Sequence, residues 1–79
     1  MVVRIEEKVL AAKFWQGDTL IGGCKYDWQE NMMLCRIVGK GCEIDFSFSC
    51  WNSGTDLQDA ISRTKLRLQK EYGEVTFVN

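Results

Sequence analysis

The clearest alternation of apolar and polar residues lies in GCEIDFSFSCW, residues 41–51. Successive side chains of an extended strand point to opposite faces, so alternate residues share a face. The pattern predicts a strand with one face in the core and the other in solvent, which is typical of an antiparallel sheet covered on one side. The predicted inward set is Cys42, Ile44, Phe46, Phe48 and Cys50, and the outward set is Glu43, Asp45, Ser47 and Ser49.

Two strands before this one follow the same alternation. The GKG sequence at 39–41 favours a hairpin that pairs Ile37 with Ile44 and leaves Arg36 in solvent, since a slip of one residue would bury Arg36. A turn at 29–30 then places Cys24 opposite Cys35 and Tyr26 opposite Met33. The residues predicted to point inward from these two strands are Cys24, Tyr26, Trp28, Met33, Cys35 and Ile37.

The N-terminal segment allows two interpretations. Residues 6–15 contain good helix formers, so a ferredoxin-like β-α-β-β-α-β arrangement would place a first helix there. The Gly17-Asp18 pair instead resembles a two-residue hairpin turn that would pair Trp15 with Leu20. We therefore predict a strand, with the helix as the alternative. The Gly22-Gly23 pair indicates a β-bulge or a close approach of the helix.

Residues 56–72 are predicted to form an amphipathic helix. Thr55 and Gln58 have the spacing of a capping box, and Gly73 suits the C-terminal position. We expect the last segment, EVTFV, to return as a short strand antiparallel to the first. The predicted inward helix face contains Leu57, Ala60, Ile61, Thr64, Leu68 and Tyr72, and the opposite, basic face contains Arg63, Arg67 and Lys70.

These elements predict a single α+β domain over residues 1–79. It is an antiparallel meander of about four strands plus a short C-terminal strand, with one face packed on a single C-terminal amphipathic helix. A chain of 79 residues with 46% hydrophobic residues suits one modest core. With no stretch near the length of a membrane span and no signal-peptide pattern, we expect a cytoplasmic protein with reduced thiols.

The four cysteines are the first candidates for chemistry. They are separated by ten, six and seven residues, and the chain has no histidine, so the spacing does not resemble a zinc site or a Cys-His nucleophile. A Cys24–Cys35 disulfide fits the register, but buried free thiols fit the expected reducing compartment better. We expect no metal and no cofactor.

Other residue types give no indication of an enzyme. The carboxylate pairs Glu43 with Asp45 and Asp56 with Asp59 suit solvated positions, and Gly22-Gly23 lacks the spacing of a phosphate loop. The net charge of −1 argues against nucleic acid as a partner, because nucleic-acid binders gather cations on one face.

The surface offers one further candidate. The register turns four apolar residues toward the outer face of the sheet, where a cluster would indicate a partner, although isolated surface hydrophobes are common. Trp and Phe are residue types that anchor interfaces. This predicted partner surface consists of Phe14, Ile21, Leu34 and Trp51.

The sequence therefore favours a small non-enzymatic binding protein that contacts a protein partner, or a second copy of itself, through its sheet surface. One alternative is a phage or mobile-element inhibitor that occludes a larger host machine. Others are a carrier of a small apolar ligand and a nucleic-acid accessory factor.

Overall fold

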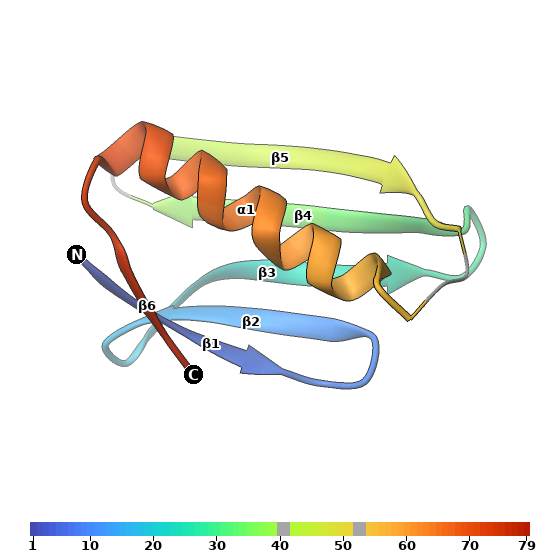
Figure 1. Ribbon diagram of the computed structural model, residues 1–79, viewed down its shortest axis with the longest axis horizontal. Coiled ribbons are helices and arrows are strands. Elements are labelled where there is room, and N and C mark those ends of the chain that lie inside the picture. Colours follow the sequence, from blue (N-terminus) through green and yellow to red (C-terminus); the bar gives the residue numbers. More distant parts are fainter. Residues whose placement is uncertain (40–41, 52–53) are drawn as a thin grey trace.

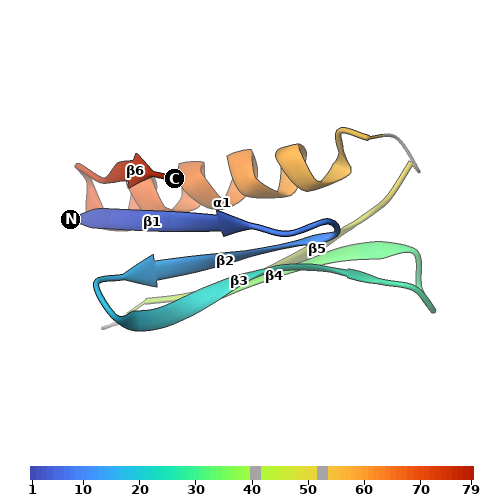
Figure 2. The same cartoon turned by 90° about the horizontal axis from the view of Figure 1, so that it is seen from below.

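A six-stranded sheet carries one helix on one of its faces (Figures 1 and 2). The computed structural model describes residues 1–39, 42–51 and 54–79, and the side chain of Cys42 lies outside the description. The strand order across the sheet is β5-β4-β3-β2-β1-β6. The predicted α+β fold class is confirmed. The elements are β1 (Val2–Glu7), β2 (Ala11–Gln16), β3 (Thr19–Asp27), β4 (Met32–Gly39), β5 (Cys42–Ser49), α1 (Asp56–Tyr72) and β6 (Thr76–Val78).

The predicted register of the central strands is confirmed. Cys24 pairs with Cys35 and Ile37 pairs with Ile44, so Arg36 lies in solvent as expected. The Gly-Lys-Gly segment at 39–41 is predicted to form the β4–β5 turn, but residues 40 and 41 lie outside the described residues, as does the predicted inward direction of the Cys42 side chain.

The N-terminal segment is strand, and the alternative of a helix at 6–15 is wrong. Residues 2–16 form two strands, β1 and β2, joined by a turn in which the Lys8 N–H donates to the Ala11 carbonyl over 2.7 Å. The expected pairing of Trp15 with Leu20 is present.

The extra strand reverses one predicted direction. β6 pairs with β1 in parallel, whereas we expected the last strand to be antiparallel to the first. Alternate strands of a meander run the same way, so adding a strand at the N-terminal side flips the first strand relative to the last. The helix therefore connects two parallel strands, β5 and β6, at opposite edges of one sheet (Figure 1).

The core lies between α1 and one face of the sheet. Ala60, Ile61, Thr64 and Leu68 of α1 are buried there, as the helical spacing predicts. Thr64 is a polar member of this face, and its hydroxyl donates to the Ala60 carbonyl over 2.8 Å. The strand residues buried beneath the helix are Val3, Ile5, Ala12, Phe14, Ile21, Cys24, Met33, Cys35, Ile37 and Ile44.

A β-bulge in β3 changes which side chains of β2 and β3 point toward the helix, compared with the prediction. The β2–β3 register shifts between Phe14 and Trp15, because Phe14 pairs with Gly22 while Trp15 pairs with Leu20. The extra residue is Ile21, so Phe14 and Ile21 both point into the core, at 0% and 7% exposure, and their predicted outward direction is wrong. Gly22 has φ +153°, and a Cβ there would lie 2.0 Å from the Arg36 carbonyl oxygen. The predicted bulge is thus present, and it requires glycine.

Two other local predictions fail for identifiable reasons. Trp28 was expected to point inward, but β3 ends at Asp27, whose carboxylate accepts from the Gln29 N–H over 3.0 Å and starts the turn. Trp28 is 76% exposed. The capping box is also absent, because the Thr55 side chain makes no capping bond and the Gln58 amide donates to Glu7 over 3.1 Å.

Candidate binding surfaces

The four residues of the predicted partner surface do not form one surface. Phe14 and Ile21 belong to the core. Leu34 is half-buried on the face of the sheet opposite α1, and Trp51 is 86% exposed just beyond the end of β5. Only Leu34 and Trp51 remain available to a partner, and they lie on different parts of the molecule.

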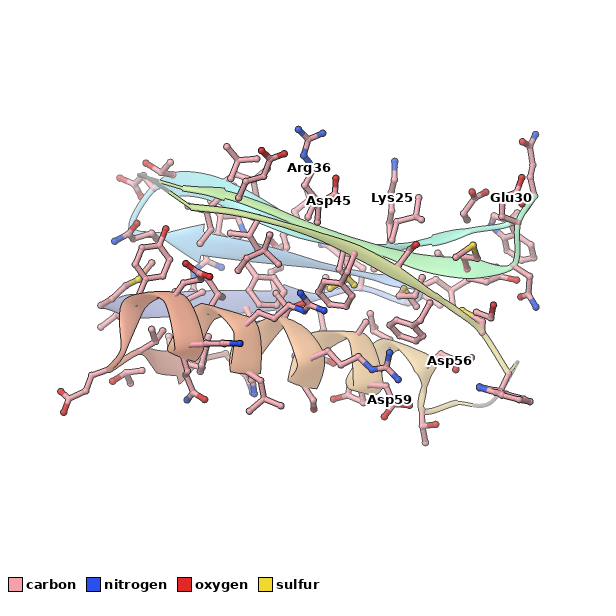
Figure 3. All side chains as sticks on the ribbon, turned by 90° about the horizontal axis from the view of Figure 1, so that it is seen from above. Lys25, Glu30, Arg36, Asp45, Asp56 and Asp59 are labelled. Carbon is pink, nitrogen blue, oxygen red and sulfur yellow. The ribbon has the colours of Figure 1, made fainter. Side chains whose placement is uncertain are left out.

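The sheet face opposite α1, here called the outer face, is lined by a row of alternating charges. Cα pairing aligns Glu6 of β1 with Lys13 of β2, Lys13 with Gly23 of β3, and Gly23 with Arg36 of β4. Arg36 aligns in turn with Asp45 of β5. Figure 3 shows Lys25, Arg36 and Asp45 pointing away from the helix. Two cations therefore flank the position where Gly23 has no side chain.

A shallow groove of about 450 Å³ lies over this glycine. Its walls include Leu20 and Val38, which are 50% and 55% exposed, and its rim includes Lys13, Lys25 and Arg36. A Cβ at Gly23 would lie 2.3 Å from the Ala12 carbonyl oxygen, so the close approach of β2 excludes any side chain there. The backbone itself thus keeps the groove open. We refer to it as the glycine groove.

At one end of the outer face, Trp15 contacts two charged side chains of β1. Its indole N–H donates to Glu6 over 3.1 Å, and the Arg4 guanidinium lies 5.4 Å from the ring centroid. Hydrogen bonds, first from Lys8 and then from Trp15, lower the pKa of the Glu6 carboxyl. By contrast, Arg36 and Glu43 form an ion pair at 3.5 Å in which both side chains are largely exposed. Such a pair contributes little and leaves Arg36 available to another anion.

The predicted basic face of α1 lies over aromatic rings. The Arg63 guanidinium is 4.1 Å from the Phe48 centroid and that of Arg67 is 4.3 Å from the Phe46 centroid. Phe46 and Phe48 are half-buried, and the two arginines lie over these rings. The two arginines thus contact β5 and help to hold the helix against it. Lys70 is exposed on the last turn of α1.

The cysteines are placed as buried thiols. Cys24, Cys35 and Cys50 are free and buried, and the Cys24 sulfur lies 3.5 Å from the Thr64 hydroxyl. The hydrogen bond with Cys24 and burial raise the pKa of the Cys35 thiol, and burial raises that of Cys50. These two thiols are therefore poor nucleophiles at neutral pH, whereas the hydrogen bond with Cys35 lowers the pKa of the buried Cys24 thiol.

Within the described residues, no group of three or more His, Cys, Asp or Glu side chains is arranged to hold a metal ion. The one helix described is too short and too polar to cross a membrane.

Sequence reasoning missed Leu20, Gly23 and Val38 as parts of the outer face. The Gly22-Gly23 pair was the available signal, because a bulge at this pair reverses which of Leu20 and Ile21 points outward. It also missed the exposed residues of the β1–β2 turn, Val9 and Leu10.

Comparison with protein-family models, with curated proteins and with solved structures finds no match to this chain.

Proposed function

We propose that this chain is a non-enzymatic protein-binding domain that contacts its partner through the outer face of the sheet. The observation that carries the proposal is the glycine groove. It joins exposed apolar walls, Leu20 and Val38, to a rim of three cations on a face that α1 does not cover. Apolar contacts supply affinity, and charges supply specificity and orientation.

The groove favours an acidic, apolar segment of a partner. A carboxylate above Gly23 would lie between Lys13 and Arg36, which the strand register places on either side of the glycine. An adjacent apolar side chain would then contact Leu20 and Val38. The partner segment therefore combines Asp or Glu with large apolar residues.

The same charges disfavour a symmetric dimer centred on the groove. A two-fold axis through Gly23 would stack Lys13 and Arg36 of one copy on the same residues of the other, because an isologous interface places a patch against itself. Like charges so placed repel each other. We therefore favour a different protein as the partner over a second copy.

Calorimetry with an acidic model peptide tests this function. The probe is an extended peptide of about ten residues that alternates glutamate with leucine. Removing one rim charge, in Lys13→Gln or Arg36→Gln, should weaken binding about three- to tenfold, which corresponds to roughly 0.7–1.4 kcal/mol. Lys70→Gln, a matched change on the last turn of α1, should change affinity less than about twofold. Absence of binding at about 1 mM peptide, or equal losses in all three variants, would overturn the proposal.

A further inference from the structure

A second apolar site lies at the end of the molecule where α1 begins. The β1–β2 turn, the β3–β4 turn and the first turn of α1 come together there (Figure 1). They surround a pocket of about 380 Å³, with the nearly buried carboxylate of Asp56 in its wall. The apolar and aromatic lining comes from Val9, Leu10, Tyr26, Trp28, Met33 and Leu57.

The rim of this pocket exposes large apolar side chains. Val9 is 91% exposed, and Trp28, in the β3–β4 turn, is 76% exposed. The backbone of Trp51 lies next to the pocket, because its main-chain N–H donates to the Asp56 carboxylate over 3.4 Å. An exposed tryptophan on the rim, Trp28, resembles the anchor residues of protein interfaces, since tryptophan is enriched among binding hot spots.

Hydrogen bonds hold the pocket in place without a ligand. The Tyr26 N–H donates to the Leu10 carbonyl over 3.1 Å, and the Tyr26 hydroxyl donates to the Asn31 side chain. Asn31 in turn donates to the Cys50 carbonyl over 3.3 Å and accepts from the Cys50 N–H over 3.0 Å. The Tyr26 ring meets Trp28 edge to face at 5.1 Å. A pocket held in this way loses little conformational entropy on binding.

Asp56 is the charged residue in the pocket lining, and the three segments that form this end of the molecule carry more carboxylates than cations. The segments at 6–10, 26–31 and 54–59 contain one cation, Lys8, which pairs with Glu6 at 3.0 Å. Figure 3 shows Glu30, Asp56 and Asp59 at this end of the molecule, where Asp56 lines the pocket and the other two are exposed outside its lining. The carboxylates in these segments besides Glu6 are Glu7, Asp27, Glu30, Asp56 and Asp59.

We infer that this pocket binds a cationic amphipathic segment of a protein, with apolar side chains against Trp28 and lysine or arginine beside Asp56 and Asp59. We choose a cationic protein segment on the ground of charge, because the same carboxylates would repel anionic membranes and nucleic acids. The glycine groove has a cationic rim on a different part of the molecule, so this inference stands independently of the function proposed for the outer face.

Calorimetry with a helical model peptide tests the inference. The probe is a peptide of about 18 residues with leucine on one helical face and lysine on the other, and the comparison peptide has glutamate in place of lysine. The lysine peptide should bind, and Trp28→Ala should weaken it at least about tenfold. Asp59→Asn should weaken it about two- to fivefold, with a reduced dependence on salt. Leu66→Ala, an exposed position on α1 away from this pocket, should leave the affinity within about twofold.

Three results would overturn the inference. Equal binding of the glutamate peptide would show that charge complementarity does not select the occupant. Unchanged affinity in Trp28→Ala would show that the peptide binds at another site. Tighter binding to vesicles with about one third anionic lipid than to the lysine peptide would identify a membrane as the occupant. Because Trp28 is exposed, its replacement should leave the melting temperature unchanged, which separates lost binding from lost folding.

Discussion

The two faces of the sheet differ in how tightly their side chains are packed. On the face under α1, apolar residues from β1 to β5 pack against one stripe of the helix, and most are almost fully buried. On the outer face, charged residues alternate across the strands around Gly23, and the apolar residues Leu20 and Val38 are half exposed. Packing fixes the first face, while the second is free to meet a partner.

A single residue decides which side chains belong to which face. The bulge at Ile21 inserts an extra residue in β3, which sends Ile21 into the core and Leu20 outward. Without this insertion, Phe14 and Ile21 would have lain outside. The division of side chains between the two faces therefore depends on the glycines that permit the bulge.

Phe14→Ala should cause the largest loss of stability. Phe14 is completely buried, and removing a buried phenylalanine costs about 3–5 kcal/mol, against a total of roughly 4–12 kcal/mol for a chain of this size. Urea denaturation followed by circular dichroism measures the difference. A loss below about 1 kcal/mol would mean that Phe14 lies on the surface.

Gly22→Ala should destabilise the fold by about 2 kcal/mol or more. The new Cβ would lie 2.0 Å from the Arg36 carbonyl oxygen at a positive φ that other residues rarely adopt. Gly54→Ala is the matched control, because a Cβ there meets no atom within 4 Å. If both variants have the same denaturation midpoint, the bulge is not where we place it.

Arg67→Ala should have a smaller effect, about 0.5–1 kcal/mol. The guanidinium lies 4.3 Å from the Phe46 centroid at the margin between α1 and β5, where a cation–π contact is partly exposed. A double-mutant cycle with Phe46→Leu isolates the contact in urea denaturation. Purely additive losses would show that the arginine does not interact with the ring.

Leu20→Ser should leave stability almost unchanged, within about 0.5 kcal/mol, because half of the side chain is already in solvent. The same substitution should weaken binding of the acidic model peptide, since Leu20 lines the glycine groove. Denaturation and calorimetry on one sample separate the two effects. A large loss of stability would assign Leu20 to the core and contradict its place on the outer face.

The sequence predicted most of the fold because alternation is strong in β3 to β5. The pairing of Cys24 with Cys35 and of Ile37 with Ile44 follows from keeping Arg36 in solvent. The split between β1 and β2 could not be predicted, because their turn at 8–10 is Lys-Val-Leu and contains none of the usual turn residues. That missing strand also explains why the direction of β6 was wrong.

The candidate surfaces were less predictable than the fold. The direction of Leu34 followed from alternation within a strand, whereas Trp51 lies beyond the end of β5, where it is exposed but alternation no longer applies. The directions of Phe14 and Ile21 did not follow from alternation, because Gly22-Gly23 indicates a bulge without saying which residue it inserts. The pocket at the start of α1 joins three turns that are distant in sequence, so no local pattern reveals it.

Mapping of the acidic peptide on the ¹⁵N-labelled protein by nuclear magnetic resonance tests most directly whether the outer face binds a partner. We expect the largest amide shifts at Leu20, Gly23, Lys25 and Val38, with the amides of α1 unchanged. Shifts concentrated on α1, or spread evenly over the molecule, would contradict the assignment of function to the outer face.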